Sequence, residues 1–230
     1  MRVSKTVAGV GLAAVCALGC QGNGGDVVLD SFADSASYAI GMNMGQSIVE
    51  VADQVDLALI QRGMADVVDG RLATLSDNEA IAVLQTFASQ VRQSQQIRMA
   101  GEAEANRTAG AAYLEENGQR EGVVTTASGL QYEVLEEGSG PRPTTADRVR
   151  VHYRGSLVDG SVFESSFEGD PVTFGVTEVI PGWTEGLQLM SVGSRYRFVL
   201  PSELAYGQGG GPGGPNSTLI FEVQLLEVVR

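Results

Sequence analysis

The nine residues VIPGWTEGL (179–187) decide the fold of this 230-residue chain, and they contain its only tryptophan. Pro181 presets the first turn of a short helix, and Trp183 and Leu187 lie four residues apart on one helical face. Strand-like runs flank the stretch, at 148–158, 194–200 and 219–229. The pattern predicts a short helix packed on the concave face of a sheet, with Trp183 either in the core or at the floor of an apolar pocket.

Alternating sequence elsewhere in the C-terminal half predicts that this sheet is antiparallel. Apolar and polar residues alternate in 130–135 and again in 148–158, which is the period of a half-buried strand. Asp159-Gly160 follows the second run and is a hairpin signal. We therefore expect residues 119–230 to form one domain, an antiparallel half-barrel sheet wrapped around the Trp183 helix.

The N-terminal half has helical periodicity and no strand alternation. Helical runs cover about 31–50 and 56–68, and a capping box of Ser76 and Glu79 opens a long helix over 76–117. From about Arg98 the apolar residues thin to alanines, which predicts a solvated spacer. The expected fold class is α+β, with an all-helical domain over 31–100, the long connecting helix and the C-terminal sheet domain.

The helical domain is too small to bury much apolar surface by itself. Met42, Met44 and Met64 lie on its helices, and methionine suits adaptable helical interfaces. The residues alone leave two interpretations open. One is an ordinary monomeric bundle, and the other is a dimer in which two chains bury these helices together.

Composition excludes several classes of function. The chain has 15 Lys and Arg against 28 Asp and Glu, and a net charge of −13 repels nucleic-acid phosphates and anionic lipid. The only histidine, His152, lies mid-strand beside Tyr153, which predicts a hydrogen-bonded structural role. The sequence has no His/Cys cluster, calcium loop or phosphate loop. We expect no cofactor, no metal and no nucleic-acid partner.

Residues 1–19 have the pattern of an export signal. Arg2 and Lys5 precede an apolar stretch that is too short for a stable membrane anchor. The sequence ALGC (17–20) then resembles a bacterial lipobox, although leucine is usual where Ala17 stands, and it predicts acylation of Cys20. Secretion with ordinary cleavage nearby remains the alternative. A short flexible tether follows over 20–30.

Five motifs occur in order through residues 119–230. They are VHYRG (151–155), DGSVFESS (159–166), VIPGW (179–183), LAYG (204–207) and PNSTLIFEV (215–223). Together they resemble the FKBP-type peptidyl-prolyl cis-trans isomerases, and the whole chain resembles their Mip/FkpA-like branch in bacterial envelopes. The resemblance implies a homodimer with intertwined N-terminal helices. It also implies a place in the periplasm or at the outer membrane, with a lipid anchor at Cys20.

The resemblance also assigns residues to a site. It makes Trp183 the floor of a pocket for the prolyl ring, and it makes the Ile180 backbone N–H and the Tyr206 hydroxyl hydrogen-bond donors to the ligand. The catalytic set that it implies is Tyr153, Phe163, Glu164, Trp183, Tyr206 and Phe221, and the substrate-binding set is Val172, Phe174, Val179 and Ile180.

Several positions depart from the family pattern. Glu164 stands where Asp is usual, and the arginine that often pairs with that Asp has no counterpart in 167–170. Val172 replaces a residue that is often aromatic, and Gly213 stands near a position commonly held by isoleucine. These changes predict an altered catalytic efficiency and an altered affinity for macrolide inhibitors, with the aromatic pocket intact.

The implied function is isomerisation of X–Pro bonds in exported proteins, a step that takes tens to hundreds of seconds without a catalyst. Proline-containing unfolded polypeptides are the expected partners. The alternative is a non-catalytic holdase that binds unfolded chains in the cleft of the helical dimer.

Overall fold

A computed structural model describes residues 27–229 of the chain. The expected signal peptide, most of the tether and Cys20 lie outside the described residues. The chain divides into two compact units, of which one ends at Thr74 and the other begins at Leu75. Among residues 27–229, none of the helices combines the length and the apolar character that crossing a membrane requires.

The first unit is helical, as its sequence predicts. It contains α1 (Phe32–Ile48), the 3-10 helix η1 (Val49–Gln54) and α2 (Leu57–Val68). A capping box of Ser31 and Asp34 begins α1, and the Asp56 carboxylate accepts hydrogen bonds from the first turn of α2. No residue of α1 is buried, and in α2 only Asp66 is buried. The apolar side chains of these helices are therefore left on the surface.

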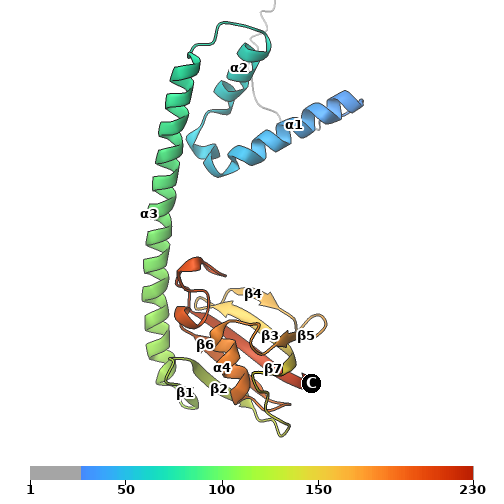
Figure 1. Ribbon diagram of the computed structural model, residues 1–230, viewed down its shortest axis with the longest axis vertical. Helices are drawn as coiled ribbons and strands as arrows, with labels where there is room; N and C mark the ends of the chain where they lie inside the picture. The colour runs from blue at the N-terminus through green and yellow to red at the C-terminus, as the bar shows by residue number, and fades with distance from the viewer. Residues whose placement is uncertain (1–26, 230) are drawn as a thin grey trace, which may run out of the picture. The chain divides into compact units, whose positions relative to one another are not determined.

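The second unit begins with the long helix α3 (Asp77–Gly118), which has 42 residues (Figure 1). Ser76 accepts a hydrogen bond from the Glu79 N–H, and the Glu79 carboxylate accepts one from the Ser76 N–H at 2.9 Å. This reciprocal pair satisfies two backbone donors that a helix start would otherwise leave unpaired. The capping box thus fixes where the long helix begins.

The remainder of the second unit is a seven-stranded antiparallel sheet with the order β1-β2-β6-β7-β3-β4, and β5 pairs with β3. Its strands are β1 (Val123–Thr125), β2 (Gln131–Glu136), β3 (Arg148–Leu157), β4 (Val162–Ser165), β5 (Val172–Gly175), β6 (Arg195–Leu200) and β7 (Leu219–Val229). Two 3-10 turns, η2 (Ser202–Leu204) and η3 (Gly207–Gly209), lie between β6 and β7. Strand β7 is central, since it pairs with β6 on one side and β3 on the other.

The short helix α4 (Pro181–Leu189) packs against the sheet (Figure 1). Trp183 and Leu187, on one of its faces, are buried. Two glycines allow the close approach. A Cβ atom at Gly182 would lie 2.5 Å from Leu200, and one at Gly186 would lie 2.7 Å from Phe198. The α+β fold class with a half-barrel sheet around a short helix is therefore confirmed.

One expectation about α3 is wrong. Its C-terminal half is not a solvated spacer, because it packs against the sheet domain. Asn117 donates to the Gln131 side chain at 2.8 Å, and Arg197 of β6 donates to the Tyr113 hydroxyl at 2.9 Å. The face carries small and polar residues at spacings of three and four: Ala103, Asn106, Gly110, Tyr113 and Asn117. A search for apolar periodicity misses such a face because its contacts are hydrogen bonds and close backbone packing.

Candidate active site

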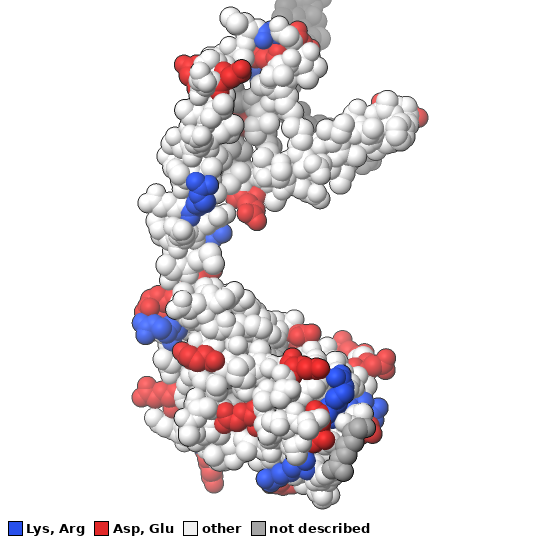
Figure 2. Space-filling model, viewed as in Figure 1, with Lys and Arg blue, Asp and Glu red and all other residues white. Residues whose placement is uncertain are grey.

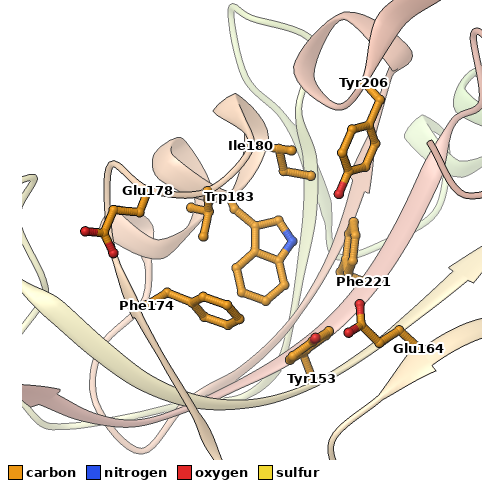
Figure 3. A pocket seen from close by; sticks show the side chains of 9 residues that line it. Tyr153, Glu164, Phe174, Glu178, Ile180, Trp183, Tyr206 and Phe221 are labelled. Carbon is orange, nitrogen blue, oxygen red and sulfur yellow. The ribbon is translucent and has the colours of Figure 1, made fainter. Parts of the chain in front are cut away.

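A pocket of about 480 Å³ opens on the concave side of the sheet domain, above α4 (Figure 3). Nine residues line it: Tyr153, Glu164, Phe174, Glu178, Val179, Ile180, Trp183, Tyr206 and Phe221. They come from strands β3, β4, β5 and β7, from the segment between β5 and α4, from the first turn of α4 and from the segment after η2. Residues far apart in the sequence therefore converge on one cavity.

The Trp183 ring lies at the centre of the pocket wall, with only 4% of the residue exposed. Three aromatic rings meet it edge to face: those of Tyr153 and Phe221, each 5.3 Å away between centroids, and that of Phe174 at 5.8 Å. Perpendicular packing of this kind is favourable because ring edges are positive and ring faces negative. The four rings form a stiff, apolar surface.

The indole N–H adds no polar character to this surface. Trp183 Nε1 is buried without a hydrogen-bond partner among the described residues. The nitrogen itself is buried, so the surface that the ring presents to the pocket is aromatic carbon. A five-membered aliphatic ring would be well accommodated on such a floor.

Tyr153 and Glu164 form a polar pair at one side of the pocket. Burial raises the pKa of Tyr153 above its ordinary value, and a hydrogen bond to the Glu164 carboxylate raises this pKa further. The hydroxyl therefore stays protonated and donates to Glu164. No ion pair of Glu164 occurs within residues 27–229, and the Tyr153 hydroxyl gives its carboxylate a neutral partner.

Two donors remain for a ligand. The backbone N–H of Ile180, just before the first turn of α4, donates to no other group in the described chain. The Tyr206 side chain is 49% exposed, and Figure 3 shows its hydroxyl directed into the pocket. A carbonyl oxygen of a bound peptide could accept from either group.

Eight of the ten residues predicted for the site line this pocket, and two do not. Phe163 stands behind Phe221, with ring centroids 5.7 Å apart, and Val172 packs against the hydrophobic core. Both residues support the wall from outside. The Phe163 ring packs directly on Gly155 of β3, where a Cβ atom would collide with it. The glycine therefore determines where that ring can lie.

Glu178 also lines the pocket, although the sequence did not indicate it. Its carboxylate accepts a hydrogen bond from the Gly175 N–H at 3.0 Å and pairs with Arg148 at 3.2 Å. The side chain is thereby held at the end of β5. Glu178 comes one residue before Val179, and this is the only sequence signal that could have placed it in the pocket.

The expected structural role of His152 agrees with its contacts. Its Nδ1 lies 3.2 Å from the Ser166 hydroxyl, and its ring stacks on Phe167 with centroids 5.5 Å apart. Within residues 27–229 there is no group of three or more His, Cys, Asp or Glu side chains that could hold a metal ion. The polar groups that line the pocket are carboxylates, hydroxyls and backbone N–H groups.

Two family models match the chain. Residues 33–134 match the domain amino terminal to FKBP-type peptidyl-prolyl isomerase, and residues 140–226 match FKBP-type peptidyl-prolyl cis-trans isomerase. The second match contains every residue of the pocket. Together the two models account for most of the described chain.

Individual proteins agree with the family models. The isomerase FkpA of Aeromonas hydrophila is 42% identical over 209 residues, which are 87% of this chain and 78% of that protein. The outer membrane protein MIP of Legionella longbeachae is 38% identical over 86% of each chain. The crystal structure of FkpA from Escherichia coli matches with a TM-score of 0.67 and 37% identity, over 87% of this chain and 98% of that chain.

Proposed function

The chain belongs to the FKBP-type peptidyl-prolyl cis-trans isomerases, and from this premise we propose that it turns X–Pro bonds in the aromatic pocket around Trp183. Peptidyl-prolyl isomerase activity on polypeptides is the function that the family and the relatives support. The comparisons do not favour the alternative of a non-catalytic holdase. What remains to be assigned is how the residues of this pocket carry out the reaction.

The reaction breaks no bond. Rotation about a peptide bond is opposed by about 18–20 kcal/mol because the C–N bond has partial double-bond character. Twisting removes this resonance, and the twisted amide is less polar than the planar one. A dry, apolar site therefore stabilises the transition state relative to the planar amide, which loses its hydration on binding. The four rings around Trp183 offer such a site.

Each polar group then has a positioning task. The prolyl ring lies on Trp183, and the Ile180 N–H and the Tyr206 hydroxyl donate to carbonyl oxygens of the bound peptide. The Tyr153 hydroxyl, held by Glu164, completes the wall without presenting a charge to the ring. The observation that carries this proposal is the closure of Tyr153, Phe174 and Phe221 around one buried tryptophan.

A proline-limited assay on short peptides tests the proposal. Full-length protein should accelerate cis-trans exchange, Trp183→Leu should remove most of the acceleration, and Tyr206→Phe should remove part of it. Gln188→Ala is a matched control, since Gln188 is on α4 but does not line the pocket. Wild-type rates in a correctly folded Trp183→Leu protein would contradict the assignment of the site.

We further propose that the helical unit is completed by a second copy of this chain. Large apolar side chains on α1 and α2 are exposed, among them Phe32, Ile40, Met42 and Val67. The visible surface of α1 is almost uncharged (Figure 2), and only one of its residues, Asp34, carries a charge. A surface of this kind is costly in water unless another chain covers it.

Sedimentation equilibrium of the full chain tests this dimer. Met42→Asp should shift the protein toward monomer, because a carboxylate in a helical interface lacks a partner. Ser47→Asp adds the same charge on a different face of α1, where a hydroxyl already stands, and should remain dimeric. A wild-type protein that sediments as a monomer would contradict the proposal.

For its location we propose the bacterial cell envelope, with a lipid anchor at Cys20. The support is the lipobox-like sequence ALGC (17–20) together with a relative named an outer membrane protein. Labelling with a radioactive fatty acid in a bacterial host should mark the wild-type protein and not Cys20→Ser. An unlabelled wild-type protein, cleaved and soluble in the periplasm, would instead support ordinary secretion.

The same pocket is proposed to take macrolide inhibitors. The glycine-rich segment after Tyr206 leaves this side of the site without the large apolar side chain that is common in the family, so we expect a reduced affinity. Quenching of Trp183 fluorescence by rapamycin measures it. An absence of quenching at any concentration would contradict macrolide binding in this pocket.

A further inference from the structure

The segment that follows Tyr206 has little side-chain material of its own. This glycine loop (207–217) contains six glycines among its eleven residues. Four of these glycines have positive φ angles, at 207, 210, 213 and 214, and so does Asn216 with a φ of 57°. Chains of this composition lose much conformational entropy on ordering, so a fixed loop needs contacts from elsewhere.

On its inner side the glycine loop packs against Tyr206. A Cβ atom at Gly211 would lie 2.5 Å from Cγ of Tyr206, so the backbone of the loop rests directly on the ring. The Tyr206 ring is half exposed and is not part of the buried core. Its position over the pocket therefore depends on where the loop lies.

On its outer side the glycine loop is held by α3. The Asn106 side-chain amide donates to two loop carbonyl oxygens, those of Gly213 and Pro215, each at 2.9 Å. Asn216 reaches back to the Ala103 carbonyl at 3.5 Å. Asn106 is 107 residues before Gly213 in the chain, and it is half-buried where α3 meets the loop.

The two donor hydrogens of one amide match two acceptors on a segment whose backbone hydrogen bonds, such as that from the Asn216 N–H to the Gly207 carbonyl at 2.8 Å, are internal and do not tie it to α3. A neutral amide is suited to this task, because a carboxylate has no hydrogen to donate and an aliphatic side chain has no polar group. Without Asn106, both carbonyl groups would turn to water, and the loop would sample several arrangements. The Tyr206 hydroxyl would then point into the pocket for only part of the time.

We propose that Asn106 is a positioning residue for the isomerase reaction: its amide holds the glycine loop against α3, and the loop holds Tyr206 over the pocket. This inference rests on the proposed function of the pocket. It gives the long helix a part in catalysis that does not require any contact between α3 and the substrate.

The test uses the full chain and two substitutions of nearly the same size. Asn106→Asp and Asn106→Leu both remove the donors, and the second adds no charge. A net hydrogen bond contributes about 1 kcal/mol, so losing the Tyr206 contact for most of the time should lower kcat/KM about fivefold. We expect the loss in kcat rather than in KM, because the apolar floor that binds the prolyl ring is untouched.

A control variant separates this role from the general docking of α3. Asn117→Ala removes a hydrogen bond between α3 and β2, at a site that does not contact the glycine loop. It should lower the stability of the sheet domain and leave kcat/KM within about twofold of the wild type. Circular dichroism checks that every variant is folded, and Trp183 fluorescence adds a second check for the variants that keep the tryptophan.

A double-mutant cycle with Tyr206→Phe decides between the outcomes. If Asn106 acts through the Tyr206 hydroxyl, Asn106→Leu should cost almost nothing in the Tyr206→Phe protein. A fivefold loss that persists in this background, or no loss in the wild-type background, would overturn the inference while leaving the pocket as the active site. If Tyr206→Phe and Trp183→Leu are both fully active, the proposed site fails, and the role of Asn106 fails with it.

Discussion

Replacing Gly110 with alanine should destabilise the sheet domain, although helix propensity alone predicts the opposite. Alanine in the interior of a helix is favoured over glycine by about 1 kcal/mol. At position 110, however, the new Cβ atom would lie 3.1 Å from the Cβ of Thr218 and closer still to its hydroxyl. Thr218 is buried, and overpacking of this kind costs about 1–3 kcal/mol.

Gly101 provides a matched control on the same helix. A Cβ atom there meets nothing within 4 Å, so Gly101→Ala gains propensity without a clash. Gly110→Ala should therefore be about 1–3 kcal/mol less stable than Gly101→Ala. Urea unfolding followed by the fluorescence of Trp183, the only tryptophan, measures this difference in the sheet domain.

The sign of the difference is decisive. If Gly110→Ala unfolds at the same urea concentration as Gly101→Ala, or at a higher one, α3 does not lie against Thr218 as described. A partial rescue is also expected in Gly110→Ala with Thr218→Ala, because the second change removes the closest atom and leaves only the Cβ contact. An additive further loss in the double variant would contradict the packing.

Three more outcomes follow from the site and from the helix start. Trp183→Leu should lower kcat/KM at least about tenfold on a prolyl peptide, since the transition state loses its aromatic floor, and unchanged kinetics would refute this. Glu164→Gln should lower the pKa of Tyr153 toward its ordinary value, because the hydrogen-bonded charge is gone while burial remains; an alkaline absorbance titration identical to that of the wild type would argue against the pair. Ser76→Ala should cost α3 about 1 kcal/mol through loss of its cap, seen as faster amide exchange in the first turn only.

The centre of the pocket could be predicted because its determinants are local in the sequence. Pro181 and the four-residue spacing of Trp183 and Leu187 specify a short helix with one apolar face, and the alternation in 148–158 specifies the strand that meets it. The five motifs around these elements also carry the resemblance to the isomerase family. Both kinds of information concern residue types at fixed spacing, and the structure brings eight of the ten expected residues together.

The docking of α3 could not be predicted from apolar periodicity. Its contact face depends on the side-chain amides of Asn106 and Asn117 and on Gly110, where the lack of a side chain allows a close approach. Sequence patterns report where apolar surface is buried, whereas this face is defined by the polar groups that it approaches: two backbone carbonyl oxygens, the Gln131 amide and the Thr218 side chain. Apart from Gln131 of β2, which is 14 residues from Asn117, these partners lie more than 100 residues away, on the glycine loop and at Thr218 just after it.

The positions of Phe163 and Val172 illustrate a second limit. Both are apolar residues at motif positions, and the sequence cannot distinguish a ring that lines a cavity from one that supports the wall. For Phe163 the difference arises from Gly155, which leaves room for this ring to pack edge to face against Phe221. Only the paired register of β3 with β4 and β7 places these three residues together.

Strand β7 lies between β6 and β3 in the sheet, yet it follows both of them in the chain. During synthesis, the other strands therefore emerge while the strand that joins them is still missing. Phe221 arrives with β7, so the aromatic wall around Trp183 is completed only when this last strand is in place. All seven prolines precede β7 as well. Every X–Pro bond of a nascent copy is thus present in the chain before its own pocket is complete.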